Sequence, residues 1–226
     1  MTDQTANIDW RDGVPIATRF DDPYYSLDNG LAETRHVFLA GNGLPARFEG
    51  DFHIAELGFG TGLNFLVTWA AWEEAGAPGR LRFTSFEAYP MDREAMAKAL
   101  AHFPELASFA DRFLASWNAG KADVALTEGV TLDVIVGDAR LTLPTWDGMA
   151  DAWYLDGFSP AKNPELWEPS LITEVGLHTR SDGTAATYSA AGHVRRALED
   201  AGFDVTRTPG FGRKRHMTTA RMPHAE

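Results

Sequence analysis

Short apolar runs alternate with amphipathic segments along most of the chain. The run at 52–57 has the length of a buried strand, and in the next segment, 63–75, Leu63, Leu66 and Trp69 fall on one helical face. The same alternation predicts further strands at 81–87, 132–137, 152–155, 184–189, 203–208 and 216–222, and further helices at 90–102, 104–120, 164–178 and 192–201. Strands that alternate with helices indicate an open, mostly parallel α/β sheet, and the last two strands predict a carboxyl-terminal antiparallel hairpin.

The first 50 residues follow a different pattern, rich in turn-forming residues. A disordered tail contains few aromatic side chains, but this segment has six: Trp10, Phe20, Tyr24, Tyr25, Phe38 and Phe48. We therefore expect residues 1–50 to form an ordered arm, with a short helix or strand at 33–39, that packs on a core domain at 51–226.

The amino-acid composition excludes several kinds of site. None of the 226 residues is cysteine, which excludes disulfides and thiolate metal sites, and the histidines show no paired spacing, so we expect no metal site. No apolar run approaches the ~20 residues of a membrane span, and the polar amino terminus is unlike a signal peptide. We therefore expect a cytoplasmic protein that does not bind membranes.

The charge is unevenly distributed along the chain. The net charge of −12 argues against a nucleic-acid partner when taken alone. The segment 205–225, however, has no acidic residue and five basic ones: Arg207, Arg213, Lys214, Arg215 and Arg221. A solvated terminal strand would explain this asymmetry as well as a polyanionic partner would.

Four of the predicted strands end in a carboxylate. Ligands of parallel α/β sheets bind beyond the carboxyl ends of the strands, near the point where the strand order reverses. Glu56, Glu87, Asp138 and Asp156 occupy such ends in four consecutive units. We expect them to gather at one ligand site, although a single strand-end acid is more often only solvated.

The first of these acids precedes a glycine loop formed by Gly58, Gly60 and Gly62. A dinucleotide fingerprint requires a glycine at the position of Leu63. The acidic-x-Gly-x-Gly-x-Gly pattern instead resembles motif I of class I S-adenosyl-L-methionine-dependent methyltransferases. A plain tight turn is the alternative.

This resemblance implies a Rossmann-like class I methyltransferase fold with S-adenosyl-L-methionine as its cofactor. Glu56 would face the cationic end of the cofactor, and Asp138 with Ala139 would face the adenine amine. As in nucleotide folds generally, Glu87 would accept the ribose hydroxyls. We also expect the side chains at the mouth of this pocket to include three further residues, Tyr24, Tyr25 and Asn64.

The segment Asp156-Gly-Phe-Ser-Pro160 occupies the position of methyltransferase motif IV, the loop that holds an acceptor amine. In this role Asp156 would supply a carboxylate and Phe158 a stacking ring, whereas an Asx turn at Asp156 is the structural alternative. The whole stretch 156–167 closely resembles the signature of the tRNA 5-methylaminomethyluridine methyltransferases of the MnmD type, which also form half of bifunctional MnmC. Further blocks extend the resemblance over about residues 10–219, namely 20–26, 30–33, 36–42, 58–66 and 210–215. His216 departs from it, because an acid is common after the Arg-Lys-Arg run.

That family methylates the amine of 5-aminomethyl-2-thiouridine at the tRNA wobble position, so the resemblance implies a tRNA N-methyltransferase with Asp156 as its catalytic residue. The wobble base must leave the anticodon stack, and RNA loops are bound by aromatic stacking and phosphate contacts. The residues expected to contact the anticodon loop are Phe158, Ser159, Pro160, Lys162, Asn163, Phe211, Arg213, Lys214 and Arg215. The bifunctional relatives carry a flavin-dependent oxidoreductase half. Because this chain ends at Glu226, we expect a separate oxidoreductase to supply the aminomethyl substrate.

Two other hypotheses stay open at this point. The acceptor could be a small-molecule or protein amine, which the acidic net charge favours, or the chain could be a non-catalytic tRNA-binding partner. The basic run at 213–215 argues against the first hypothesis. The intact Asp156 and glycine loop argue against the second.

Overall fold

The computed structural model describes residues 5–26, 29–76, 79–117, 122–127 and 129–224, and its centre is an eight-stranded sheet. In spatial order the strands are β10 (Asp204–Pro209), β11 (His216–Arg221), β9 (Thr179–Thr187), β8 (Ala150–Leu155), β4 (Phe52–Leu57), β5 (Leu81–Glu87), β7 (Val130–Val136) and β6 (Ala122–Thr127). Only β6 and β11 run antiparallel to the rest of this sheet. The predicted parallel α/β sheet with a terminal β10–β11 hairpin is therefore confirmed.

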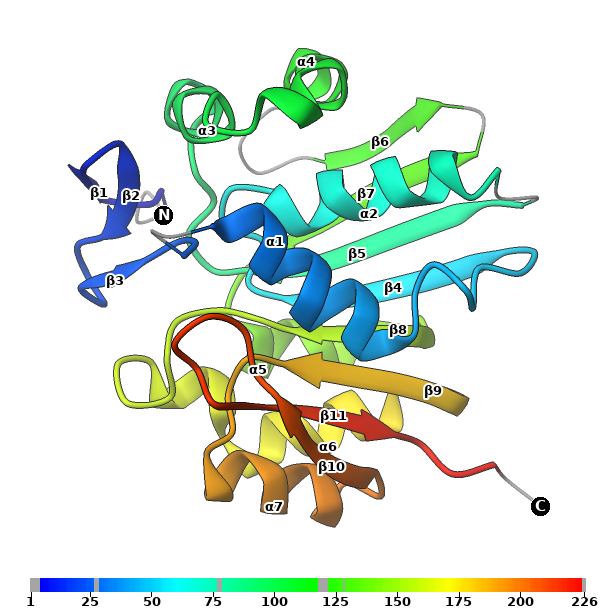
Figure 1. Cartoon of the computed structure of the whole chain (residues 1–226). Coiled ribbons are helices and arrows are strands. Elements are labelled where there is room, and N and C mark those ends of the chain that lie inside the picture. The colour runs from blue at the N-terminus through cyan, green and yellow to red at the C-terminus, as the bar shows by residue number, and fades with distance from the viewer. Residues whose placement is uncertain (1–4, 27–28, 77–78, 118–121, 128, 225–226) are drawn as a thin grey trace.

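Helices cover both faces of the sheet (Figure 1). One face packs against α1 (Gly30–Thr34), α2 (Leu63–Glu74), α3 (Arg93–Leu100) and α4 (Ala107–Ser116). The other packs against α5 (Ala139–Thr142), α6 (Pro169–Leu177) and α7 (Gly192–Asp200). Successive side chains of a strand point to opposite faces. Accordingly, Tyr154 of β8 packs in the first core and its neighbour Trp153 in the second, and both are fully buried.

The amino-terminal segment adds a small antiparallel sheet of β1 (Ile8–Arg11), β2 (Val14–Ala17) and β3 (Asp22–Pro23). The sequence pattern did not reveal these short strands, but the expected short element near 33–39 is present as α1 and a π-helical turn (Arg35–Leu39). Figure 1 shows the small sheet on the side toward which the parallel strands point. The Lys98 ammonium lies 3.8 Å from the ring centre of Trp10, and the Tyr25 hydroxyl donates to the Ala99 carbonyl at 3.3 Å. The proposed division between arm and core at residue 50 stays a prediction.

Several predicted boundaries were wrong for local reasons. The helix expected from residue 90 begins at Arg93, because the Asp92 side chain caps it by accepting from the Ala95 N–H. The helix expected at 164–178 is divided into a 3-10 turn (Pro164–Trp167) and α6. Glu168 between them is extended, with ψ 140°, as the residue before a proline tends to be.

In the segment expected as one helix at 104–120, a 3-10 turn (Pro104–Leu106) is likewise followed by α4, and positions 118–120 lie outside the described residues. Beyond it lies β6, an edge strand that no prediction included and that pairs antiparallel with β7. Short edge strands carry a weaker hydrophobic pattern than buried parallel ones, which explains why β6 was missed.

The strand order reverses at β4. The chain leaves this strand toward β5 and β7 on one side and later returns to β8 on the other. Gly58 follows β4 and Gly157 follows β8, with φ of 85° and 110°, which only glycine adopts readily. A Cβ on Gly58 would lie 3.0 Å from the Cα of Gly157. The two loops thus approach closely at the place where sheets of this kind bind ligands.

Candidate active site

A cavity of about 410 Å³ opens at this reversal point. Its walls come from the glycine loop after β4, the first turn of α2, the loop after β8, the amino-terminal segment and the β10–β11 loop. A second hollow, also of about 410 Å³, shares Gly58, Glu87, Gly157 and Phe158 with the first. The predicted site residues therefore surround two adjoining cavities, and Glu87 lies where the two meet.

The first cavity holds most of the residues expected at the glycine loop and motif IV. In its wall are Tyr25, Gly58, Gly60, Asn64, Glu87, Asp156, Phe158, Ser159, Phe211, Arg213 and Lys214. The second hollow holds Asp138, Ala139, Lys162 and Asn163. Four predicted site residues line neither cavity, namely Glu56, Gly62, Pro160 and Arg215.

Asn64 connects two carboxyl groups at the centre of the site. Its Nδ2 lies 2.9 Å from Oε1 of Glu56 and 2.7 Å from Oδ2 of Asp156. Its Oδ1 accepts from the Thr34 hydroxyl at 3.0 Å. The other oxygen of Glu56 accepts from the Ser85 hydroxyl at 2.7 Å. Residues from α1, α2, β4, β5 and the loop after β8 thus form one continuous hydrogen-bonded chain.

Burial favours the neutral forms of the Glu56 and Asp156 carboxyl groups. It raises the pKa of Asp156 to about 6, against the opposing effect of the Asn64 N–H. It also raises the pKa of Glu56 well above its usual range. Glu56 is fully buried beneath the cavity, so in this structure its carboxyl contacts Asn64 and Ser85 rather than the cavity.

Glu87 stabilises the glycine loop. Its Oε2 accepts from the Gly60 N–H at 2.9 Å and its Oε1 from the Tyr89 N–H at 2.8 Å. Burial raises the pKa of Glu87, and these backbone N–H groups oppose the rise. A carboxylate oxygen accepts more than one hydrogen bond. Glu87 lies at the junction of the two cavities, where the backbone N–H groups of Phe59 and Ala88 also act on its carboxylate.

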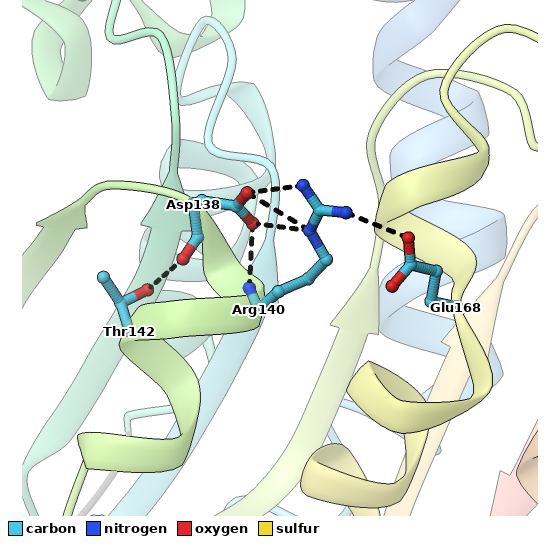
Figure 2. A network of polar contacts seen from close by, with 4 residues as sticks. All are labelled: Asp138, Arg140, Thr142 and Glu168. Atoms are coloured by element: carbon cyan, nitrogen blue, oxygen red, sulfur yellow. Dashed lines mark hydrogen bonds and ion pairs between the residues drawn. The ribbon is translucent and has the colours of Figure 1, made fainter.

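Asp138 has very different surroundings (Figure 2). It caps α5 by accepting from the Arg140 N–H at 3.0 Å, and its Oδ2 lies 2.7 Å from the Arg140 guanidinium. The same guanidinium pairs with Glu168 at 2.9 Å. The hydrogen bonds from Arg140 hold the pKa of Asp138 below its usual range. Both carboxylate oxygens of Asp138 are engaged by Arg140, so an adenine amine would have to share or displace these contacts.

The motif IV loop is held by the amino-terminal segment. The Phe158 ring stacks on Phe20 at 4.7 Å between ring centres and meets Tyr24 edge-on at 5.2 Å. Asp22 accepts from the Ser159 N–H at 2.9 Å and pairs with the Lys162 ammonium at 3.2 Å. Lys162, expected at a phosphate, therefore ties this loop to the arm.

The basic β10–β11 loop forms the other side of the first cavity. The Lys214 ammonium lies 2.8 Å from Oε1 of Glu33 and 4.0 Å from the ring centre of Tyr188. The Tyr188 hydroxyl donates to the Gly157 carbonyl at 2.7 Å. Lys214 is thus turned toward the cavity, whereas Arg215 lies outside its wall and is exposed.

Sequence reasoning missed several of these groups. Tyr188 follows β9 and could have been found by the same strand-end rule as the acids, but the strand was predicted to continue to residue 189. Arg140, two residues from Asp138, was available as a local ion-pair partner. Thr34 and Glu33 lie on α1, and no local signal in the sequence brings them to the site.

The strand order, the glycine loop at the reversal point and the acids around it define the class I methyltransferase fold. A model of the S-adenosyl-L-methionine-dependent methyltransferase family matches residues 104–223, more than half of the chain, and the chain belongs to this family. The glycine cradle at Gly58 and Gly157, together with the position of Glu87 at the junction of the two cavities, fits its cofactor, S-adenosyl-L-methionine.

Individual relatives agree with this assignment. The chain is 48% identical over 219 residues to the tRNA 5-methylaminomethyl-2-thiouridine biosynthesis bifunctional protein MnmC of Ralstonia nicotianae, covering 94% of this chain and 33% of that protein. The chain thus spans about a third of the length of that relative. The crystal structure of MnmC2 from Aquifex aeolicus is 25% identical with a TM-score of 0.75, covering 100% of this chain and 74% of the other. A methyltransferase from Pyrococcus furiosus shares the fold, at 12% identity and a TM-score of 0.51, covering 96% of this chain and 89% of the other.

The described residues contain neither a candidate membrane span nor a candidate metal cluster. None of the helices they form combines the length and apolar character of a membrane span. Among the same residues, no group of three or more His, Cys, Asp or Glu side chains has the arrangement of a metal site.

Proposed function

We propose that this methyltransferase transfers a methyl group from S-adenosyl-L-methionine to the amine of 5-aminomethyl-2-thiouridine at the tRNA wobble position, giving 5-methylaminomethyl-2-thiouridine. The name of the MnmC relative, 48% identical over 94% of this chain, supports the substrate. The observation that carries the proposal is Asp156, a half-buried carboxyl in the cavity wall that Asn64 holds at 2.7 Å and whose pKa is raised to about 6.

The acceptor chemistry explains why such a group is useful. A primary alkylamine is mostly protonated at neutral pH and has no lone pair in that form, so it must lose a proton before it attacks. Bound S-adenosyl-L-methionine supplies an electrophilic methyl group on a cationic sulfur. Asp156 accepts an N–H of the amine and aligns its lone pair, and a pKa near 6 makes it a better proton acceptor than an ordinary carboxylate. Alignment in a fixed geometry supplies much of the rate.

The cofactor roles follow the geometry in part. We assign Gly58, Gly60 and Glu87 to direct cofactor contact, since they lie at the junction of the two cavities or beside it. Ala139, in the second hollow, faces the adenine side. Glu56 and Gly62 lie outside the cavity wall and act indirectly. Glu56 accepts from Asn64, and Gly62 turns the chain into α2.

The RNA roles are assigned to the two loops over the first cavity. Phe158 and Phe211 flank it and offer ring faces to an extruded base. Arg213, Lys214 and Arg215 provide positive charge, which would contact backbone phosphates on an otherwise acidic protein. Lys162 and Lys214 are already paired with Asp22 and Glu33, so RNA would compete with these contacts.

The test is methyl transfer from labelled S-adenosyl-L-methionine to two tRNA pools. One pool comes from cells that lack this enzyme, and the other from cells that lack the earlier aminomethylation of the wobble uridine. Label confined to the wobble nucleoside of the first pool is the expected result. Cofactor binding without label in either pool would overturn the tRNA substrate and favour a small-molecule or protein amine.

A further inference from the structure

The side chain of Asn64 has a role that its position in the glycine-loop motif does not reveal. A carboxamide has two N–H donors and one acceptor oxygen. Asn64 donates one N–H to Glu56 and the other to Asp156, and its oxygen accepts from the Thr34 hydroxyl. The residue is 6% exposed. Its amide is therefore engaged within the protein, although Asn64 lies in the cavity wall.

These bonds restrain Asp156. The amide is fixed at three points, by partners on β4, on α1 and after β8. Gly62, left-handed with φ 76°, turns the chain into α2 so that Asn64 lies in its first turn, beside the ends of β4 and β8. Oδ2 of Asp156 is thus held at 2.7 Å, and rotation of the carboxylate is opposed by a rigid donor.

The charged groups around Asp156 also shift its pKa, and the hydrogen bond from Asn64 acts among them. The Glu33 carboxylate on α1 raises the pKa of Asp156, and the Lys214 ammonium lowers it. Glu56 beneath the cavity and Tyr188 in its wall also lie near Asp156, and burial favours the neutral form of each. The further titratable groups in this wall are Asp22, Tyr24, Tyr25, Glu87 and Arg213. Among the groups that favour the charged form of Asp156, the Asn64 N–H has the largest effect.

We propose that Asn64 is a positioning residue for methyl transfer, which holds one oxygen of Asp156 against the buried Glu56 and so presents the other oxygen to the acceptor amine. The inference rests on the proposed function for the identity of that amine. It differs from the expectation that Asn64 contacts the cofactor, because both of its donors are directed at carboxyl groups.

The decisive variant is Asn64→Ser, which cannot make both donations. Carbon-13 labelling of aspartate allows the Asp156 carboxyl to be titrated by NMR, with its signal identified by its absence in Asp156→Asn. A hydrogen bond to a charged group changes a pKa by about one unit or more. We expect the Asp156 titration and the acid limb of the kcat/KM profile to move to higher pH by about one unit. The cofactor Kd, measured by calorimetry, should stay within about threefold of wild type.

Two other variants separate this role from general damage. Thr68→Val removes a buried hydroxyl from the same helix, where it donates to the Asn64 carbonyl and touches neither carboxyl group. It should lower Tm without moving the Asp156 titration. Thr34→Val removes only the donor to the Asn64 oxygen. It should give a smaller shift in the same direction as Asn64→Ser, and it tests the proposal if Asn64→Ser fails to fold.

The outcomes are distinct. An unmoved Asp156 titration with a cofactor Kd weakened more than tenfold would make Asn64 a cofactor ligand and overturn the proposal. An unmoved titration with only a lower Tm would mean that Asn64 has a purely structural role. That result would also overturn the proposal. Titration and cofactor binding need no tRNA. Failure of wild-type enzyme to methylate any tRNA would therefore count against the proposed function alone.

Discussion

Two aspartates that follow two parallel strands of one sheet, separated by β4 and β5, have opposite electrostatic surroundings. Asp156, after β8, lies half-buried against Asn64, and desolvation of its carboxyl raises its pKa to about 6. Asp138, after β7, has a side chain 38% exposed and an arginine partner, and its pKa is lowered. Topology brings both acids to the ligand edge of the sheet, but their neighbours decide what each can do.

The difference lies in the kind of donor that each aspartate meets. Asp156 receives a neutral amide N–H, which orients the carboxylate without supplying a countercharge, so the cost of burial remains. Asp138 receives a guanidinium that also reaches Glu168, which stabilises its charge. A group kept near its titration point suits proton transfer, whereas a group kept ionised suits binding or structure.

The strongest test of this contrast is catalytic. Asp156→Asn keeps the size of the side chain but removes its capacity to take a proton, and we expect kcat/KM to fall by about 10²–10⁴-fold. The cofactor Kd, measured by calorimetry, should change little. Activity within tenfold of wild type would mean that Asp156 is not the acceptor-site carboxylate.

The second prediction concerns stability. The substitution that lowers activity should here stabilise the protein. Because the pKa of Asp156 is raised from 3.8 to about 6, ionisation is more costly in the folded state. The wild type therefore loses stability as the pH rises through this window, and the full penalty persists above it. A shift of about two units corresponds to at most about 3 kcal/mol. Asp156→Asn should raise Tm at pH 8 and give no gain near pH 4. A lower Tm at pH 8 would contradict the burial argument.

How far the sequence predicted this site depends on the distance between partners along the chain. The strand-end acids and the glycine loop were found because a strand followed by a turn is a local pattern. The Asn64 contact to Thr34 joins residues 30 apart, and its contact to Asp156 spans 92. No periodicity encodes such pairs. Asn64 was accordingly expected at the cavity, but its hydrogen bonds to Glu56 and Asp156 were not.

The same reasoning applies to the fold. The buried parallel strands were predicted because burial on both faces makes them continuously apolar, as in Phe52–Leu57. The three short strands of the amino-terminal sheet and the edge strand β6 lack that pattern. Their existence depends on pairing with a neighbour, which a single segment does not specify.

The third prediction concerns the Asp138 ion pair. Asparagine caps helices as well as aspartate does, so Asp138→Asn keeps the α5 cap and removes the charge. A lowered carboxyl pKa contributes stability above the unfolded pKa, which is lost as the pH falls through the folded one. Because the pair is more than a third exposed, we expect a loss of no more than about 1 kcal/mol at pH 7, and a smaller loss at about pH 2. Urea unfolding at the two pH values measures it.

The smallest effect should follow from Glu168→Gln, which removes the outer member of the same network. The Glu168 side chain is 41% exposed and contacts only one end of the guanidinium, whose other end stays on Asp138. Surface pairs of this kind contribute about 0.5 kcal/mol or less and are screened by salt. We expect a change of that size at low ionic strength and none at 0.5 M salt. A larger loss, combined with a weaker cofactor Kd, would show that Glu168 keeps Arg140 in place for the cofactor. Asp138 and Asp156 would then differ less than their pKa values indicate, since both would act through a positioned neighbour.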